Sequence, residues 1–550
     1  MQYILNAPET INATIDLPAS KSISNRALII NALAGNGIMP DNLSDCDDTE
    51  VILDALRDMP DTIDIKAAGT AMRFMTAYLA VTPGTHLLTG TERMKQRPIK
   101  VLVEALRYLG ADISYEGNEG YPPLRINGKK LEGGSIEIPG DVSSQYISAL
   151  LMVAPVMEKG LELKLTGDII SRPYIDLTLC TMIDFGAEAE WLGSDTIKVE
   201  PKPYSPRPYF IENDWSAASY WYEMLAINGN EESEIKLTGL TDGSRQGDSA
   251  VKYLFSMLGI KTIFETREPG VPTTVTLKRI SMASDRLDYD FINQPDMVQT
   301  FVVCCCMMNR PFCFTGLSSL RIKETDRIEA LKTEMRKLGY VIEETSPGEL
   351  RWDGTRCEPE PGAAINTYED HRMAMAFAPA AIKIPGLRIN DPQVVSKSYP
   401  NFWLDLTRAD SPSARRPEPN MGLLVICLAA MALLFILLKA VRRRLPKAEQ
   451  PEGGTACANE SACAQAGASC MHDCVMEQAV KEIEYFDDEE LDAYKGRKSD
   501  SYTDEEAAQF AEVLYTMRPS EVKDWTASLT LRGISMPDQI KDEAIMLMEG

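Results

Sequence analysis

The chain has 550 residues, of which 44% are hydrophobic and 25% are charged, so it is long enough for about three globular domains. Its formal net charge is −25, and more than half of that excess lies after residue 450. The part before residue 410 is only mildly acidic and has no basic stripe, which argues against nucleic acid as its partner.

Cysteine and histidine usage indicates a reduced, cytoplasmic main body. Seven cysteines before residue 360 lie in apolar or irregular contexts without metal-ligand spacing: Cys46, Cys180, Cys304, Cys305, Cys306, Cys313 and Cys357. The N-terminal stretch MQYILNAPETINATI lacks a basic region followed by an apolar one, so we expect no signal peptide. The chain has three histidines, which disfavours a multi-histidine metal site in the body.

In chain order, one phrase recurs four times before residue 360: an amphipathic helix, a glycine, and two short alternating segments separated by turn residues. The glycines that follow these helices are Gly110, Gly186, Gly259 and Gly339. Each fits a left-handed helix C-cap, and the segments after it predict a β-hairpin.

A second pattern interleaves with the first, because six times small or polar residues lead into an apolar helix. The six starts are PASKSISNRAL (18–28), AAGTAMR (67–73), PGDVSSQYISALL (139–151), NDWSAAS (213–219), NQPDMVQT (293–300) and YEDHRMAMAF (368–377). Together the two patterns predict a pseudo-symmetric α/β protein of six small units, with three units on each side of residue 211.

The polar helix starts point to an anionic ligand. A helix N-terminus has unpaired N–H groups and a partial positive charge, so several termini that face one cleft favour a multiply charged anion. Plain caps on six core helices fit the patterning alone equally well. The junctions also carry many cations and a few carboxylates, which suits phosphate and carboxylate binding with proton transfer. No Walker loop and no strand-linked GxGxxG is present, so nucleotide binding by those routes is disfavoured.

The stretches that carry this chemistry resemble a known family. PASKSISNRAL, AGTAMR, QRPI, VSSQYISALLM, SRPYID, KETDRI, DHRMAM and SKSYPNF occur in family order, and the chain is similar to the 3-phosphoshikimate 1-carboxyvinyltransferases (5-enolpyruvylshikimate-3-phosphate synthases) over residues 1 to about 408. The resemblance implies two domains of three βαβαββ units each, one formed by 20–211 and the other by 1–19 and 212–409. It implies a monomer without metal or organic cofactor.

The implied reaction belongs to the shikimate pathway, which leads to chorismate and the aromatic amino acids. The enolpyruvyl group of phosphoenolpyruvate moves to the 5-hydroxyl of shikimate 3-phosphate, and phosphate leaves a tetrahedral intermediate. Several negative charges meet in such a site, so many Arg and Lys side chains are needed to offset their repulsion.

The resemblance also implies residue roles. Shikimate 3-phosphate would be held by Lys21, Ser22, Arg26, Ser143, Ser144, Gln145, Ser171, Tyr174, Asp296, Ser319 and Lys323. Phosphoenolpyruvate would be held by Lys21, Gly69, Arg97, Gln145, Arg327, Arg372 and Lys397. Asp296 would accept the proton of the attacking hydroxyl, and Glu324 would relay a proton at the methylene carbon, with Lys21 as a competing candidate.

Three positions depart from the family pattern: Ala67 and Ser319 stand where asparagine is usual, and Phe74 stands where proline is usual. Because every charged position is kept, we expect these changes to alter affinity and inhibitor response without abolishing activity.

Two other functions are alternatives for this sequence. The UDP-N-acetylglucosamine enolpyruvyl transferases share the architecture, but they would have Lys-Asn in place of Lys21-Ser22 and a reactive cysteine in a mobile loop. A catalytically idle relative that serves as a membrane-tethered binding protein is the other alternative. Retention of Asp296, Glu324 and Lys397 speaks against it.

The tail after Arg408 has a different character. Residues 410–420 are a polar, proline-rich linker, and 421–441 form an apolar run long enough to span a membrane, although a buried core helix has the same composition. The three arginines at 442–444 favour a cytoplasmic C-terminal side, which conflicts with a cytoplasmic enzyme on the N-terminal side. Fusion of two proteins at Met421 would resolve this conflict.

Residues 442–477 begin with arginines and then carry Cys457, Cys463, Cys470 and Cys474. The cysteine spacing matches no strong zinc template, so metal binding, palmitoylation and disulfides all remain open. We expect 478–550 to be an acidic helical module for protein contacts.

Overall fold

The computed structural model describes residues 1–410, except for 36, 37, 269, 281 and 282. It also describes scattered residues between 489 and 541. The chain divides into two compact units, Met1–Val425 and Ile426–Gly550. The predicted membrane span at 421–441 and the cysteine-containing segment at 442–477 lie outside the described residues, as does the linker after Asp410. Of the helices in the described part, none is both long and apolar enough to cross a membrane.

Four sheets of the first unit share one strand order, in which a parallel pair is extended on one side by an antiparallel hairpin. In the first lobe, one sheet has the order β3 (Thr62–Asp64), β4 (Gly84–Thr89), β6 (Leu124–Gly128), β5 (Asp112–Tyr115). The other sheet of this lobe has the order β7 (Gly134–Pro139), β8 (Leu161–Thr166), β10 (Thr196–Val199), β9 (Ala189–Trp191). In the second lobe, one sheet has the order β2 (Asn12–Asp16), β11 (Glu234–Leu240), β13 (Thr273–Arg279), β12 (Ile260–Phe264). The other has the order β14 (Leu287–Asp290), β15 (Phe312–Thr315), β17 (Glu349–Trp352), β16 (Glu343–Ser346). The predicted hairpins are therefore confirmed.

A fifth sheet has three strands, with β18 (Ala364–Ile365) parallel to β19 (Leu387–Asn390) and β1 (Gln2–Leu5) antiparallel to β19. It follows the same order as the other four sheets, without the outer strand of the hairpin.

All six polar starts open a helix, as predicted. These helices are α1 (Lys21–Leu33), α3 (Gly69–Val81), α5 (Ser144–Val153), α7 (Trp215–Asn228), α9 (Val298–Met307) and α11 (His371–Phe377). They are mostly buried and pack on one another in two groups of three, α1 with α3 and α5, and α7 with α9 and α11.

The other α-helices of residues 1–410 are α2 (Asp47–Asp58), α4 (Lys100–Tyr108), α6 (Arg172–Asp184), α8 (Val251–Met257), α10 (Arg327–Lys337) and α12 (Phe402–Asp410). The left-handed C-caps predicted from the repeat are confirmed, because the four glycines after α4, α6, α8 and α10 have φ of 104°, 90°, 85° and 91°. A residue with a Cβ is strained at such φ values, so glycine is favoured where these helices end.

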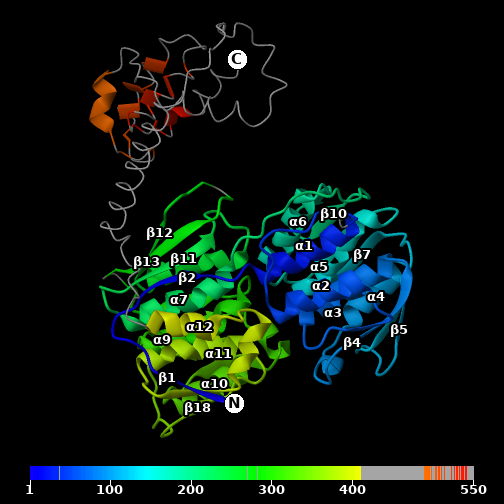
Figure 1. Cartoon of the computed structure of the whole chain (residues 1–550), viewed down its shortest axis with the longest axis horizontal. Helices are drawn as coiled ribbons and strands as arrows, with labels where there is room; N and C mark the ends of the chain where they lie inside the picture. Colours follow the sequence, from blue (N-terminus) through cyan, green and yellow to red (C-terminus); the bar gives the residue numbers. More distant parts are fainter. Residues whose placement is uncertain are drawn as a thin grey trace, which may run out of the picture. The chain divides into compact units, whose positions relative to one another are not determined.

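Two hydrophobic cores define two lobes in the first unit (Figure 1). The first lobe has its core between residues 28 and 204, and the second lobe has its core in 11–17 and 215–409. The chain crosses between the lobes near Ala19 and again near Asn213, where these two residues form an antiparallel bridge. This crossing places the start of α1 beside the start of α7.

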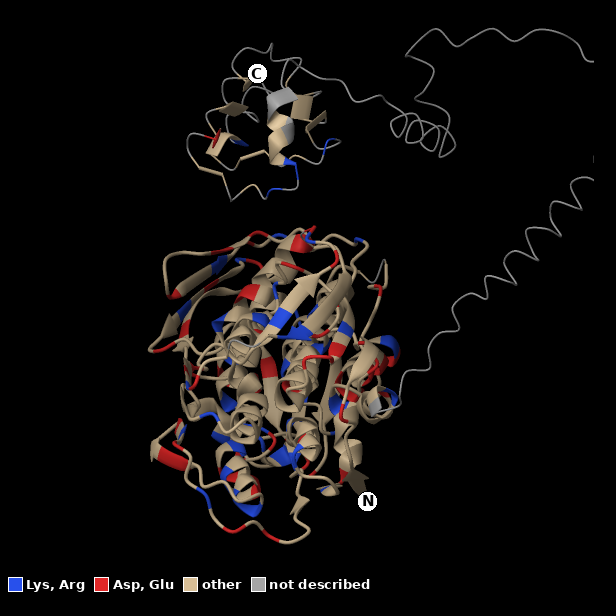
Figure 2. Cartoon of the chain, turned by 90° about the vertical axis from the view of Figure 1, so that its left-hand side faces the viewer, with Lys and Arg blue, Asp and Glu red and all other residues tan. Residues whose placement is uncertain are grey.

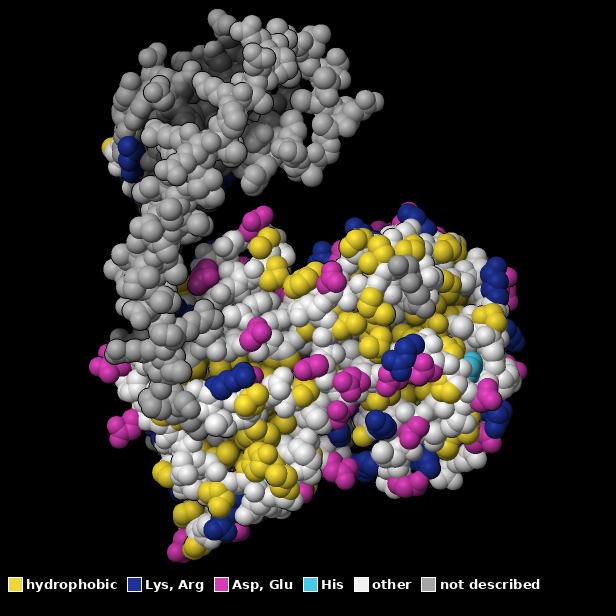
Figure 3. All heavy atoms as spheres, in the orientation of Figure 1, with side chains coloured by type: hydrophobic (Ala, Val, Ile, Leu, Met, Phe, Trp, Pro, Cys, Tyr) yellow, Lys and Arg dark blue, Asp and Glu magenta, His cyan; other side chains and the backbone are white. Residues whose placement is uncertain are grey.

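Charged side chains of both signs are interspersed along the elements of residues 1–410 (Figure 2) and on the face of this part shown in Figure 3. This distribution agrees with the lack of a basic stripe in the sequence.

The C-terminal unit has a small core of its own. Leu491, Phe510, Leu514, Trp525 and Leu529 are among its buried residues, and the 3₁₀ helix η9 covers Glu489–Tyr494. The helical character of 478–550 as a whole stays a prediction.

Candidate active site

A cavity of about 430 Å³ lies between helix starts of the first lobe and loops of the second lobe. Every site residue predicted from the sequence lines it, except Lys397. The predicted residues that line it are Lys21, Ser22, Arg26, Gly69, Arg97, Ser143, Ser144, Gln145, Ser171, Tyr174, Asp296, Ser319, Lys323, Glu324, Arg327 and Arg372. These residues come from eight separate stretches of the chain and meet at one place.

Lys397 lies beside the cavity. It ends the 3₁₀ helix η7 (Pro392–Lys397), and its Nζ donates to the Glu369 carbonyl at 3.0 Å. It lines a small neighbouring pocket together with Arg97 and Glu324, which also line the main cavity. Ala67 lines the same small pocket.

Lys21 is the first residue of α1. Its Nζ lies 3.6 Å from Asp48 Oδ2, and its backbone N–H donates to Asp214 Oδ2 at 3.3 Å. Burial lowers the pKa of the Lys21 ammonium, but Asp48, Cys46 and Glu324 together outweigh this effect and raise the pKa, so the ammonium stays protonated.

Arg26 lines the cavity, yet most of its donors serve its own lobe. Its guanidinium donates to Thr178 Oγ1 at 2.7 Å, to Ser148 Oγ at 3.1 Å, and to the carbonyls of Ser22 and Tyr174. The ring of the fully buried Phe74 lies 5.4 Å from the guanidinium carbon. Burial lowers the pKa of Arg26 to about 10, so it remains charged at neutral pH.

Two arginines meet over the start of α3. A Cβ on Gly69 would lie 2.5 Å from Arg97 Nη1 and 3.0 Å from Arg73 Nη1, so only glycine leaves room for this approach. Arg73 Nη1 donates to the Gly69 carbonyl at 2.9 Å, and burial next to Arg97 lowers the pKa of Arg73 to about 10. Two adjacent cations at a helix N-terminus make a strong anion pocket. Arg73 was not predicted as a site residue, although it belongs to the AGTAMR stretch.

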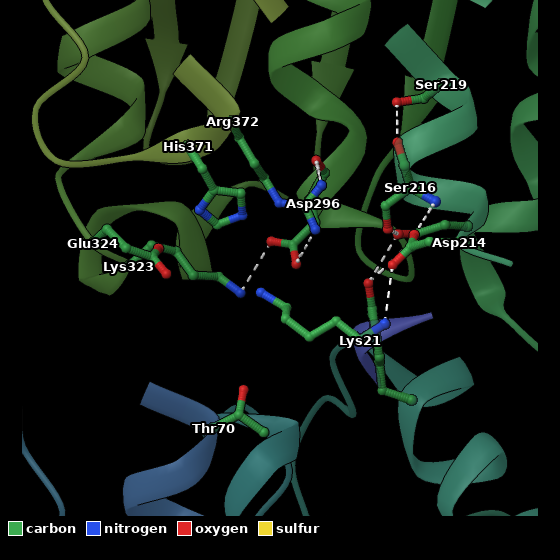
Figure 4. Close-up of polar contacts among 12 residues, drawn as sticks. Lys21, Thr70, Asp214, Ser216, Ser219, Asp296, Lys323, Glu324, His371 and Arg372 are labelled. Atoms are coloured by element: carbon green, nitrogen blue, oxygen red, sulfur yellow. Dashed lines mark hydrogen bonds and ion pairs between the residues drawn. The ribbon is translucent and has the colours of Figure 1, made fainter. Parts of the chain in front are cut away.

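Three cations surround Asp296, which lies in the 3₁₀ helix η4 (Pro295–Met297), and Figure 4 labels two of them, Lys323 and Arg372. Lys323 Nζ and Arg327 Nη1 lie 3.3 and 2.9 Å from its Oδ1, and Arg372 Nη2 lies 3.2 Å from its Oδ2. Burial disfavours the charged carboxyl, but Lys323, Arg372 and Arg327 outweigh it and hold the pKa of Asp296 well below its usual range. Asp296 is therefore a carboxylate in the free protein.

Arg327 is a hub for three carboxylates. Its guanidinium is almost fully buried and contacts Asp370 Oδ2 at 2.6 Å and Glu324 Oε2 at 3.0 Å, besides Asp296. Burial works against the charge on Glu324, yet Arg327, Arg97 and other cations hold the pKa of Glu324 well below its usual range. Asp370 was missed in the sequence, where a carboxylate before an apolar helix reads only as an N-cap. It does cap α11, accepting from the Arg372 N–H at 2.9 Å.

His371 lines the cavity and is 3% exposed. Within the described residues neither ring nitrogen has a hydrogen-bond partner, and Nδ1 lies 3.9 Å from Asp370 Oδ1. Burial, together with Lys21 and Arg372, lowers the pKa of His371 well below its usual value, so its ring is neutral at pH 7.

Neutral lining residues come from the starts of α5 and α6 and from a 3₁₀ helix of the second lobe. Ser143 caps α5, Gln145 Nε2 donates to Thr70 Oγ1 at 3.1 Å, and Ser319 lies in the 3₁₀ helix η5 (Ser318–Ile322). Ser171 has φ of 55°, a strained value for a residue with a Cβ, and its N–H donates across the lobes to the Ile292 carbonyl at 2.8 Å.

In the part of the chain that the structure describes, no group of three or more His, Cys, Asp or Glu side chains is arranged to hold a metal ion. The seven cysteines before residue 360 are free thiols. The four cysteines of the tail lie outside the described residues.

Comparison with known proteins agrees with these findings. The family model described as EPSP synthase (3-phosphoshikimate 1-carboxyvinyltransferase) matches residues 5–63 and 59–406. A 3-phosphoshikimate 1-carboxyvinyltransferase of Bacteroides fragilis is 58% identical over 409 residues, which are 74% of this chain and 98% of that protein. One of Shewanella halifaxensis is 36% identical over 437 residues, with 73% and 98% coverage. The structure of an EPSP synthase from Acinetobacter baumannii has a similar fold, with a TM-score of 0.61 at 20% identity, and covers 74% of this chain and 98% of its own.

Proposed function

Because residues 5–406 of this chain belong to the EPSP synthase family, we propose that it transfers the enolpyruvyl group of phosphoenolpyruvate to the 5-hydroxyl of shikimate 3-phosphate. The products are 5-enolpyruvylshikimate 3-phosphate and phosphate, and the reaction is a step of the shikimate pathway. The observation that carries the proposal is the single cavity in which cations from both lobes meet Asp296 and Glu324.

Two groups of lining residues suit the two substrates. Hydroxyl and amide side chains at the starts of α5 and α6, with Lys21, Ser22, Arg26, Ser319 and Lys323, would bind shikimate 3-phosphate. The Arg97 pocket over Gly69, with Gln145, Arg327, Arg372 and the neighbouring Lys397, would bind phosphoenolpyruvate. Charge-assisted hydrogen bonds from arginine suit both a phosphate and a carboxylate.

Asp296 is a weak base in the free protein, because three cations stabilise its carboxylate. When phosphoenolpyruvate binds, its negative charges share Arg327 and Arg372 with Asp296, which raises the pKa of Asp296. The Asp296 carboxylate then accepts the proton of the 5-hydroxyl of shikimate 3-phosphate, while the oxygen of that hydroxyl bonds to C2 of phosphoenolpyruvate. Asp296 is thus a competent base only in the loaded site.

Protonation of the methylene carbon C3 completes the addition. Glu324 shares Arg327 with Asp296, so bound substrate would raise its pKa as well and let it relay the proton. Lys21 stays protonated and is the competing donor. Loss of a proton from C3 and departure of phosphate then break down the tetrahedral intermediate.

We further propose that the two lobes are two domains, 20–211 and 1–19 with 212–409, each built from three βαβαββ units. The site residues are divided between the lobes, so closure of the lobes on both substrates would exclude water from the intermediate.

The test uses the full 550-residue chain with both substrates and follows phosphate release and the enolpyruvyl product. We expect turnover in the wild type, and a loss of about 10²-fold or more in Lys21→Ala and in Glu324→Ala. Lys159→Ala removes an exposed lysine paired with Glu132 in the first lobe and serves as the matched control. Binding of both substrates without turnover would support the idle relative instead, and binding of neither would refute the proposal.

A further inference from the structure

Asp248 lies outside the cavity but contacts its wall. It belongs to the 3₁₀ helix η3 (Gly247–Ala250) of the second lobe and is 3% exposed. The Tyr174 hydroxyl of the first lobe donates to its carboxylate, at 3.2 Å from Oδ1 and 3.1 Å from Oδ2. Tyr174 lines the cavity, whereas no predicted role involves Asp248.

The approach of η3 to α6 is built into the backbone. A Cβ on Gly247 would lie 2.4 Å from Pro173 Cβ, so the glycine lets η3 pack directly against the residue before Tyr174. The preceding Gln246 is buried, and its Oε1 accepts from Ser20 Oγ at 3.0 Å and from the Trp215 N–H at 3.2 Å. The segment that carries Asp248 is therefore tied to both lobes.

Asp248 is also held from the second lobe. Ser216, in the first turn of α7, donates its hydroxyl to Asp248 Oδ2. The same turn is capped by Asp214, whose Oδ1 accepts from the Ser216 N–H at 2.7 Å and whose Oδ2 accepts from the Lys21 N–H (Figure 4). Asp248 thus belongs to a polar network that reaches the start of α1.

These contacts determine what Tyr174 presents to a ligand. A phenol hydroxyl can donate one hydrogen bond, and that of Tyr174 donates to Asp248. This bond anchors the Tyr174 hydroxyl to the second lobe. Burial raises the pKa of Tyr174 well above its usual value, with Asp248 adding to the shift, so the phenol stays neutral. The anchored ring is left as a fixed surface of the cavity.

We propose that Asp248 is a positioning residue for shikimate 3-phosphate, because it fixes the ring of Tyr174 as a wall of that substrate's subsite. The inference rests on the proposed function, since it assigns Tyr174 to shikimate 3-phosphate and the Arg97 pocket to phosphoenolpyruvate. Without the hydrogen bond to Asp248, the side chain of Tyr174 is free to rotate. Shikimate 3-phosphate must then order this side chain when it binds, and the entropy cost weakens its binding.

The experiment measures KM for each substrate and kcat in the full chain. We expect Asp248→Ala and Tyr174→Phe each to raise KM for shikimate 3-phosphate about 5- to 20-fold, and to change KM for phosphoenolpyruvate by less than about twofold. The double variant should resemble either single variant, because both remove the same hydrogen bond. Asp248→Asn keeps an acceptor for the phenol and should restore most of the affinity.

The chain offers a matched control in Tyr222→Phe. The Tyr222 hydroxyl contacts Thr262 Oγ1 at 2.9 Å, and its buried side chain is not among the residues that line the cavity. This variant should leave both KM values unchanged, which separates positioning from a general effect of losing a buried phenol.

Each outcome is decisive. Additive effects in the double variant, or equal rises in both KM values, would overturn the inference while leaving the proposed function intact. If Asp248→Ala does not fold, an unchanged KM in Tyr174→Phe overturns it equally well. A wild-type chain without turnover would refute the proposed function itself, on which the inference depends.

Discussion

Replacing Gly69 by alanine probes the geometry of the anion pocket most directly. The added Cβ would lie 2.5 Å from Arg97 Nη1, which is about 1 Å closer than an ordinary contact, so the guanidinium must move by about that distance. A charge-assisted hydrogen bond of about 2.8 Å then lengthens beyond useful reach, which costs roughly 1.5–3 kcal/mol. We therefore expect KM for phosphoenolpyruvate to rise about 10- to 100-fold.

Steady-state kinetics of the Gly69→Ala chain test this estimate. KM for shikimate 3-phosphate should change by less than about threefold, since that substrate is assigned to the other side of the cavity. Gly117→Ala is the matched control, because a Cβ there would meet only Pro123 Cδ, at 3.7 Å. An unchanged KM for phosphoenolpyruvate, or an equal rise for both substrates, would refute the assignment of Arg97 to phosphoenolpyruvate.

Two further predictions concern buried charge. Asp370→Asn leaves Arg327 short of a fully buried partner, so the free energy of unfolding in urea should fall by roughly 3 kcal/mol, whereas Asp288→Asn at an exposed ion pair should change little. Equal losses in the two variants would contradict this reasoning. Burial raises the pKa of Asp248 to about 6, and the negative charge of Asp296 adds to this shift. The folded state therefore binds the proton of Asp248 more tightly than the unfolded state does. Because of this difference, the free energy of unfolding falls as pH rises from about 4 to 6. Asp248→Asn should therefore unfold like wild type at pH 4 but be more stable by about 3 kcal/mol at pH 7, and a pH-independent difference would rule this out.

Much of the fold was predictable because its signals are local. The glycine after each amphipathic helix and the polar residues before each apolar helix act within one turn of the backbone, so the sequence alone locates those helix ends. The site residues predicted from the family motifs could also be identified from the sequence. All of them line the cavity except Lys397, which lies next to it.

The partners of each side chain were decided only by the tertiary structure. No functional role was predicted for Asp370 or Asp248 from the sequence, but their carboxylates contact Arg327 and Tyr174. Arg26 was expected to serve a ligand, and most of its donors bind its own lobe.

The physical reason is the range over which each effect acts. A helix cap or a positive φ is settled by neighbours a few residues away, so composition and spacing determine it. The protonation of Asp296, the crowding of Arg97 over Gly69 and the anchoring of Tyr174 depend on distances between residues far apart in the chain. Only the packing of the two lobes sets those distances, and with them the charge that each side chain offers to a substrate.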